Sequence, residues 1–182
     1  MNEMLKLMHD RRSTRAYRPE PLQEAVIQQI LEAGRFAPSG MNKQLNHFYV
    51  ITDPNYLADL TALVSRKMEN YRDKDFRYGA PVLVLVTNQK ESTTCVQDAS
   101  CAMENMMLAA FSLGVGSCWI NQPYHLREDA EMRSLLSELG ALPDEFPCCS
   151  LALGLPEGPL FPGRREHTGN QVTWLVGEEK NS

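Results

Sequence analysis

The sequence predicts a mixed β-sheet covered by helices, and three observations lead to this fold class. Amphipathic stretches with helical spacing alternate along the chain with short apolar runs that are typical of strands. Residues 81–87 form a continuous run rich in Val and Leu, which indicates a strand buried on both faces. Residues 95–113 are apolar around most of a helix circumference, which indicates a helix buried either inside one subunit or in a subunit interface. A chain of 182 residues suits one compact domain, and we expect residues 1–182 to form it.

The first third of the chain predicts two helices, one strand and the start of a third helix. Residues 2–10 and residues 22–35 carry apolar side chains at helical spacing, and residues 47–52 are typical of a strand. Asp53 offers an N-cap and Pro54 a first-turn proline, so we expect the third helix to begin there.

The rest of the chain predicts three more strands and one more helix besides the two segments described above. The strands are residues 116–120, 148–155 and 172–176, and the helix is residues 126–139. Residues 70–78 are polar and aromatic with mixed charge, and we expect a mobile segment or a short helix over a site.

Composition narrows the class of partner. The net charge of −5 argues against nucleic acid as the main partner, because proteins that follow a phosphate backbone are usually basic overall. No apolar run is long enough to span a bilayer, so no membrane partner is expected. The five cysteines are odd in number and no signal peptide precedes them, which indicates reduced thiols in a cytoplasmic protein. They include no Cys-x-x-Cys pair, so no metal site is expected.

Two short motifs carry the candidate chemistry. Residues 11–15, Arg-Arg-Ser-Thr-Arg, suit a phosphate, because each charge-assisted hydrogen bond to its oxygens contributes roughly 1.5–3 kcal/mol. Residues 37–44, Ala-Pro-Ser-Gly-Met-Asn-Lys-Gln, form a loop in which small residues let the backbone approach a flat ring and carboxamides can match its edge. Taken alone, a solvated helix end also explains the first motif, and a helix-to-strand turn also explains the second.

These two motifs, in this order and spacing, resemble the nitroreductase family of FMN-dependent oxidoreductases. The resemblance continues through Gly79-Ala80-Pro81, residues 98–120 and the late Gly163-Arg164-Arg165. It implies an α+β, nitroreductase-like fold with a central mixed sheet flanked by helices. It also implies an intertwined homodimer with two flavin sites at the subunit interface, in which the C-terminal segment reaches across to the partner.

The resemblance implies a role for the arginines and the serine of residues 11–15. Arg11 and Ser13 would bind the FMN phosphate, and Arg12 would lie near the ribityl chain or the phosphate. Arg15 matches the basic residue at the N1/O2 edge of the isoalloxazine ring. A fixed cation there stabilises the reduced anion more than the neutral oxidised ring, so we expect Arg15 to tune the cofactor.

The loop of residues 37–44 supplies further implied cofactor contacts. Pro38, Ser39 and Gly40 match a loop that the family contributes from the opposite subunit. Asn42 and Gln44 match its polar members, near the ring and the ribityl hydroxyls.

A third set of implied contacts lies along the flavin ring, and its members are Trp119, Ile120, Asn121 and Gln122. A backbone N–H near Asn121 or Gln122 would face N5 or O4 of the ring. Many relatives have an acidic residue and a glycine where this sequence has Asn121 and Gln122. A backbone contact depends little on the side chain, so we expect this difference to affect substrate preference more than the cofactor contact.

Two regions keep alternative interpretations open. A late basic residue would complete the phosphate site, and spacing favours Arg165 over Arg164, with surface pairing to Glu166 as the competing interpretation. In residues 70–78, Asn70 or Lys74 could contact the cofactor, or the aromatic residues could form a wall over the ring. Those aromatic residues are Tyr71, Phe76 and Tyr78.

The predicted reaction is hydride transfer from NAD(P)H through flavin N5 to an electron-poor small molecule, such as a nitroaromatic or a quinone, by a ping-pong mechanism. No side chain is expected to act as a catalytic nucleophile or acid-base group, because the cofactor carries the chemistry. The chain contains no Gly-x-Gly-x-x-Gly motif, so no separate nicotinamide-binding domain is expected. Two alternatives are a related flavoenzyme with a specialised reaction (dehydrogenation, dehalogenation or flavin cleavage) and a non-catalytic flavin-binding module.

Overall fold

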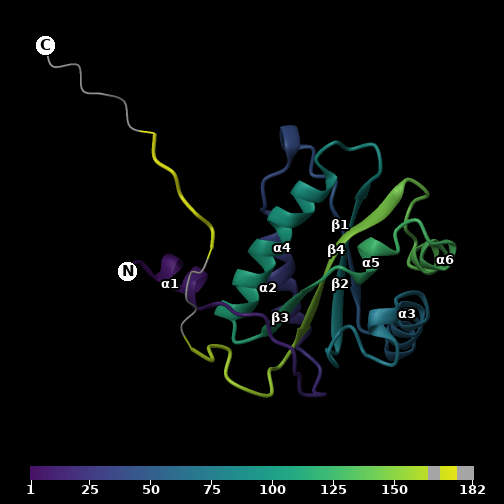
Figure 1. The fold of residues 1–182 in the computed structure, drawn as a ribbon, viewed down its shortest axis with the longest axis horizontal. Helices are drawn as coiled ribbons and strands as arrows, with labels where there is room; N and C mark the ends of the chain where they lie inside the picture. Colours follow the sequence, from purple (N-terminus) through teal and green to yellow (C-terminus); the bar gives the residue numbers. More distant parts are fainter. Residues whose placement is uncertain (164–168, 176–182) are drawn as a thin grey trace, which may run out of the picture.

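The computed structural model describes residues 1–163 and 169–175, and its α+β architecture is built around one four-stranded sheet (Figure 1). The helices and short helical turns are α1 (Glu3–Asp10), α2 (Glu24–Arg35), η1 (Gly40–Asn42), α3 (Pro54–Lys67), η2 (Glu69–Tyr71), α4 (Cys95–Ser112), α5 (Gln122–His125) and α6 (Ala130–Glu138). The strands are β1 (His47–Ile51), β2 (Val82–Gln89), β3 (Gly116–Ile120) and β4 (Glu145–Gly154). Within the described part of the chain, no helix is long and apolar enough to cross a membrane.

The strand order is β1-β2-β4-β3, and within the described residues every strand pair is antiparallel. The expectation of a mixed sheet is therefore wrong for these residues. After α3, residues 68–81 carry the chain back along the sheet, so β2 begins beside the end of β1, with Ile51 opposite Leu83. The strands β2 and β3, which flank α4 in the sequence, do run in the same direction. The strand β4 lies between them and pairs antiparallel with both.

The two faces of the sheet carry separate apolar clusters. One face packs against α3 and α6, through side chains such as Leu60 and Met132. The other face packs against α2 and α4, through side chains such as Ile30 and Met103. Because helices cover both faces, all residues of β2 except Gln89 are buried, which confirms the prediction from the Val/Leu run.

The helix α4 is buried largely within one chain. Its apolar side packs between α2 and the sheet, and its buried residues include Met103, Met106 and Met107. Cys101 and Glu104 lie on its exposed side. Burial inside the subunit therefore explains most of its apolar circumference.

Two predicted elements differ from the structure. The helix expected over residues 126–139 begins later, at Ala130, because the Asp129 side chain accepts hydrogen bonds from the N–H groups of Glu131 and Met132. Residues 172–175 form no strand, and residue 176 lies outside the described part of the chain. The side chains of Val172, Trp174 and Leu175 are exposed.

The helix α1 is amphipathic but buries none of its own residues. The Asn2 side chain caps its start by accepting a hydrogen bond from the N–H of Met4. Met4, Leu5 and Met8 form an apolar face that is largely exposed. An unburied apolar helix face of this kind is typical of a surface that contacts another chain.

Candidate functional site

Residues 11–15 lie against the start of β3. The N–H of Thr14 donates a hydrogen bond to the carbonyl of Ser117 at 2.8 Å. Gly116 makes this approach possible, because a Cβ on Gly116 would lie 2.8 Å from Cγ2 of Thr14. The phenol of Tyr17 donates to the carbonyl of Thr14 at 2.8 Å and anchors the other end of the segment in the core. The basic segment is thus fixed to the sheet and is not a free helix end.

Arg11 is held in a partly enclosed position with unused hydrogen-bonding capacity. Its side chain is 19% exposed, and its nearest carboxylate is Glu104, with 3.9 Å between Nε and Oε1. Its Nε is buried and, among the described residues, has no hydrogen-bond acceptor. A buried guanidinium donor without an acceptor is costly unless a ligand completes it.

Arg12 differs from Arg11 because backbone carbonyls already occupy its guanidinium. Its Nη1 donates to the carbonyls of His9 at 2.7 Å and Arg11 at 2.8 Å, and its Nη2 donates to Gly163 at 3.3 Å. Its guanidinium carbon also lies 5.8 Å from the centre of the Phe161 ring. These contacts indicate that Arg12 ties the basic segment to residues 161–163.

Ser13 and Arg15 surround the buried thiol of Cys118 on β3. Burial raises the pKa of this thiol, while the Arg15 cation, a hydrogen bond from Ser13 and the Arg11 cation oppose the rise. Arg15 itself is exposed, and its guanidinium carbon lies 5.9 Å from the centre of the Tyr78 ring. The segment therefore presents cations and a hydroxyl beside β3.

The loop of residues 38–44 is held at the N-terminal end of α4. The N–H of Gly40 donates to Oδ1 of Asp98 at 3.0 Å, and the Thr94 hydroxyl donates to the other carboxylate oxygen at 3.1 Å. A Cβ on Gly40 would lie 2.6 Å from the Thr94 hydroxyl oxygen, so only glycine fits this approach. Pro38 is exposed and adjoins this anchored position.

Within this loop, the polar side chains form local hydrogen bonds. The hydroxyl of Ser39 accepts a hydrogen bond from the N–H of Gln44, and the Gln44 amide donates to Oδ1 of Asn42, both at 3.0 Å. Met41, Asn42 and Gln44 all have positive φ angles, which is uncommon for residues other than glycine. The loop is therefore a defined structure with Asn42 and Gln44 exposed on its outer side.

The junction of β3 and α5 lies at the far end of β3 from residues 11–15. Ile120 is buried in the core, and the Trp119 indole donates to the Asn121 side chain at 2.6 Å. Asn121 is exposed, whereas Gln122 is buried. The Oε1 atom of Gln122 is buried and, among the described residues, accepts no hydrogen bond.

The structure does not bring all the predicted site residues together in one chain. Residues 11–15 lie against the start of β3, and residues 119–122 span its end. The loop of residues 38–44, in contrast, contacts the first turn of α4. Thr14 contacts Gly116, which follows the last turn of α4. A helix of 18 residues is about 27 Å long, and Figure 1 shows η1 and the chain after α1 near its opposite ends. Arg164 and Arg165 lie outside the described residues.

In the segment of residues 69–80, the three aromatic residues lie in different surroundings. Phe76 is fully buried and Tyr71 packs against the core, so neither forms an open wall. Tyr78 is partly exposed beside Arg15. The Lys74 amine donates to the Asn70 carbonyl at 3.1 Å, which folds both residues into a local turn.

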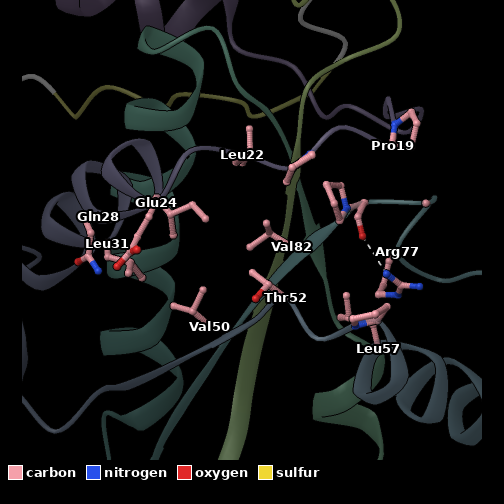
Figure 2. A pocket seen from close by; sticks show the side chains of 16 residues that line it. Pro19, Leu22, Glu24, Gln28, Leu31, Val50, Thr52, Leu57, Arg77 and Val82 are labelled. Atoms are coloured by element: carbon pink, nitrogen blue, oxygen red, sulfur yellow. Dashed lines mark hydrogen bonds between the residues drawn. The ribbon is translucent and has the colours of Figure 1, made fainter.

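A cavity of about 750 Å³ lies between α2, the exposed edge of β1 and residues 77–82. Figure 2 shows Leu31 of α2 and Leu22, which precedes this helix, on one side, Val50 on β1, and Arg77 bonded to a backbone carbonyl on the other side. Its lining residues include none of the predicted site residues that the structure describes. The sequence did not predict this cavity. It lies beside β1 at the edge of the sheet, and the strand order that puts β1 at the edge cannot be read from the sequence.

The described residues contain no group of three or more His, Cys, Asp or Glu side chains placed to hold a metal ion. All five cysteines are free thiols, and Cys118, Cys148 and Cys149 are buried. The chemistry that this region can supply is therefore ligand binding by guanidinium, hydroxyl, amide and backbone groups.

Comparison with known proteins gives consistent matches along the chain. Residues 8–155 match the family model described as the nitroreductase family. A protein of Archaeoglobus fulgidus, assigned by name to NADH dehydrogenase and NAD(P)H nitroreductase activity, is 33% identical over 168 residues, covering 86% of this chain and 87% of the relative. The FMN reductase [NAD(P)H] of Bacillus subtilis is 27% identical, covering 100% of this chain and 78% of the relative. The crystal structure of a nitroreductase with bound FMN from Bacteroides fragilis has a TM-score of 0.88 and 33% identity, covering 96% of this chain and 100% of that one.

Proposed function

This chain belongs to the nitroreductase family and is an FMN-dependent NAD(P)H oxidoreductase, and we propose that its acceptor is an electron-poor small molecule such as a nitroaromatic or a quinone. The observation that supports FMN binding by this chain is the basic segment held against β3, in which the buried Nε of Arg11 has no hydrogen-bond acceptor among the described residues. The reaction is proposed to be ping-pong, with donor and acceptor using one site in turn.

The residues around β3 fit FMN. The Nε of Arg11, which has no hydrogen-bond acceptor among the described residues, and the hydroxyl of the exposed Ser13 suit two phosphate oxygens, since charge-assisted bonds to phosphate are strong. Gln122 offers a buried acceptor that a ring or ribityl donor would satisfy. The guanidinium of Arg12 already donates to backbone carbonyls. We therefore propose that Arg12 holds residues 11–15 in place and also lies near the phosphate.

FMN, when bound, supplies the two-electron chemistry by accepting a hydride at N5 from NAD(P)H and passing it to the acceptor. The protein's part is to bind, orient and tune. Arg15 presents a positive charge where negative charge grows during reduction, which favours the reduced state. The backbone N–H groups of Asn121 and Gln122, after Ile120, would be the donors to the ring.

We propose that each site is shared between two copies of the chain. The loop of residues 38–44 and the basic segment are anchored near opposite ends of α4, so one chain does not supply both to one ligand. The apolar face of α1, with Met4, Leu5 and Met8, supplies a surface that a second copy would cover. In this homodimer, Pro38, Ser39, Gly40, Asn42 and Gln44 come from the partner.

The cavity beside β1 is proposed to receive the partner's C-terminal segment. Among the described residues β1 is an edge strand, so its outer backbone groups can pair with a further strand, and the adjoining cavity is lined mainly by apolar residues. Trp174 is 83% exposed and Leu175 is 101% exposed on their own chain.

Ending the chain after residue 170 is expected to lower the dimer fraction in light scattering, and an unchanged dimer would contradict this assignment.

One observation favours a second candidate. The side chain of Gln122 is buried, and its Oε1 accepts no hydrogen bond among the described residues. A specialised reaction of the same cofactor, such as dehydrogenation of a small metabolite, would use such a polar contact.

A cytoplasmic location stays a prediction.

The test is the visible absorption spectrum of the purified protein, before and after anaerobic addition of NADH or NADPH. A flavin spectrum that bleaches quickly supports the proposed reductase, and product-inhibition patterns with a quinone then test the ping-pong order. A flavin spectrum that persists with both donors would favour the specialised enzyme or a binding module. No flavin after addition of FMN would contradict the proposed site.

A further inference from the structure

Residues 75–80 form a rigid bracket between α3 and β2. The carboxylate of Asp75 accepts hydrogen bonds from the N–H of Arg77 at 2.9 Å and from the N–H of Gly79 at 3.1 Å. It also pairs with the guanidinium of Arg77 at 3.1 Å. One carboxylate therefore closes the turn at three points.

Two side chains, the buried Phe76 and the partly buried Arg77, anchor this bracket to the body of the protein. Phe76 is 1% exposed within the cluster under α3. The Arg77 guanidinium donates to the Thr61 hydroxyl at 3.1 Å and to the Ala80 carbonyl at 2.8 Å. Burial lowers the pKa of Arg77, and the Asp75 charge opposes that shift. The backbone between these anchors has little freedom.

Tyr78 lies at the apex of the bracket in an unfavourable backbone conformation. Its φ angle is +59°, a region that aromatic residues rarely adopt. Such conformations persist only where the surroundings impose them, and they are concentrated at functional sites. The side chain does not gain burial from this strain, since it remains 37% exposed.

The imposed conformation places the Tyr78 ring beside Arg15. The ring centre lies 5.9 Å from the guanidinium carbon, within the range of a cation–π contact. Burial raises the pKa of the neighbouring Tyr17, with Cys118 and Tyr78 adding to the rise and Arg15 opposing it, so these side chains lie within electrostatic reach of one another. Among the described residues, no hydrogen bond or ion pair holds Arg15. The ring of Tyr78 is thus its defined partner.

We propose that Tyr78 is a positioning residue that holds the Arg15 guanidinium at the cofactor's pyrimidine edge and so sets how strongly the protein prefers reduced FMN. The inference rests on the proposed function, because it requires FMN beside Arg15. The phenol ring supplies the contact, and the hydroxyl is not required for it. A guanidinium without this contact would spread over several side-chain conformations and lose part of its effect on the reduced ring.

The experiment measures FMN dissociation constants for the oxidised and the anaerobically reduced cofactor, and their ratio gives the preference for the reduced state. Tyr78→Asn removes the ring at a residue type that tolerates positive φ, and Tyr78→Gly is a second such variant should the first fold poorly. Tyr78→Phe keeps the ring. We expect Tyr78→Asn to lower the preference about two- to fivefold and Tyr78→Phe to change it less than twofold.

The double variant Arg15→Ala/Tyr78→Asn separates positioning from general damage. Once Arg15 is absent, loss of the Tyr78 ring should not change the preference further. A matched control is Tyr124→Leu, which removes another guanidinium–aromatic contact, that of Arg127 at 4.3 Å, and should leave the preference unchanged.

The outcomes distinguish this inference from the proposed function. If wild-type protein binds FMN, the proposed function stands whatever the Tyr78 variants show. If it binds neither oxidised nor reduced FMN, both the proposed function and the role of Tyr78 are contradicted. With FMN bound, the inference fails if Tyr78→Asn leaves the ratio unchanged or if Tyr78→Phe loses as much as Tyr78→Asn. It also fails if the effect persists in the Arg15→Ala background.

Discussion

Thr14 and Ser117 are joined by a backbone hydrogen bond of 2.8 Å, although 103 positions separate them in the sequence (117 − 14 = 103). This bond attaches the segment of three arginines to the first half of β3. The same strand leads directly into Asn121 and Gln122, so the two groups of predicted cofactor contacts share one rigid element. Changes that separate the segment from β3 should therefore affect FMN binding before they affect the core.

The buried Nε of Arg11 leads to the first prediction. Arg11→Ala should raise the FMN dissociation constant roughly 10- to 150-fold, because it removes a charge-assisted hydrogen bond worth about 1.5–3 kcal/mol. Fluorescence titration with FMN measures the change. Arg66→Ala is the control, since Arg66 on α3 forms a surface pair with Glu131 on α6, and it should bind FMN normally. Equal affinity of Arg11→Ala and wild type would contradict the phosphate assignment.

Gly116 gives the second prediction, because a Cβ there would meet Thr14 at 2.8 Å. Gly116→Ala should reduce the free energy of unfolding by about 1–3 kcal/mol and weaken FMN binding, since the basic segment must move away from β3. Gly158→Ala is a matched control, because a Cβ on Gly158 meets nothing within 4 Å. Thermal unfolding and FMN titration of both variants provide the comparison. If the two variants behave alike, contact with Thr14 is not what requires glycine.

Mixed dimers test the sharing of sites between subunits. One chain carries Arg11→Ala, and the other carries Ser39→Ala, Asn42→Ala and Gln44→Ala, with different affinity tags for purification. If a site combines the basic segment of one chain with the loop of the other, each mixed dimer has one intact site and one doubly altered site. We expect tight binding of one FMN per mixed dimer, measured by titration.

The same experiment has a clear opposite result. If each chain supplied both motifs to its own site, every site of the mixed dimer would carry one defect. Tight binding would then be absent, as in the two parent homodimers.

Asp129 provides a prediction about pH. The Lys67 ammonium, at 3.0 Å, and the N–H groups of Glu131 and Met132 hold the pKa of Asp129 below its ordinary value of 3.8. A lowered folded-state pKa contributes stability above pH 3.8, and this contribution is lost as the pH falls through the folded value. Asp129→Asn should therefore lower the Tm at pH 6, and the difference from wild type should shrink below pH 3.8. In a Lys67→Met background the difference at pH 6 should be smaller, and an equal difference would exclude Lys67 as the cause.

Local patterns predicted most elements of this fold because each one depends on a few neighbouring residues. The Asp53-Pro54 pair marks the start of α3, and helical spacing identifies α2 and α4. The start of α6 at Ala130 also had a local signal, the Asp129 N-cap, which the longer apolar pattern concealed. The antiparallel sheet had none, because it depends on where residues 68–81 return the chain and on the insertion of β4 between β2 and β3.

The candidate site was predictable as a set of residue types but not as an arrangement. Three arginines in five positions indicate an anion site from sequence alone. That Arg12 is bonded to carbonyls while Arg11 keeps a free donor depends on Gly163, His9 and the path of the backbone. The separation of residues 38–44 from residues 11–15 by α4 is a property of packing, and spacing in the sequence does not encode it. Tyr78 was one of three equivalent aromatic residues until the turn at Asp75 was known.

The position of β4 also has a consequence for how the chain is made. Among the described residues β4 is the last strand in the sequence, yet it is an inner strand of the sheet and the neighbour of β3. As the chain leaves the ribosome, β3 has no adjacent strand within the described residues until Gly154 has been synthesised. The binding residues on β3 therefore acquire their final geometry late, after a non-local pairing step that is slow compared with helix formation. Before that step the nascent chain exposes a strand of five residues without its neighbour β4, and an exposed strand edge favours association with other chains.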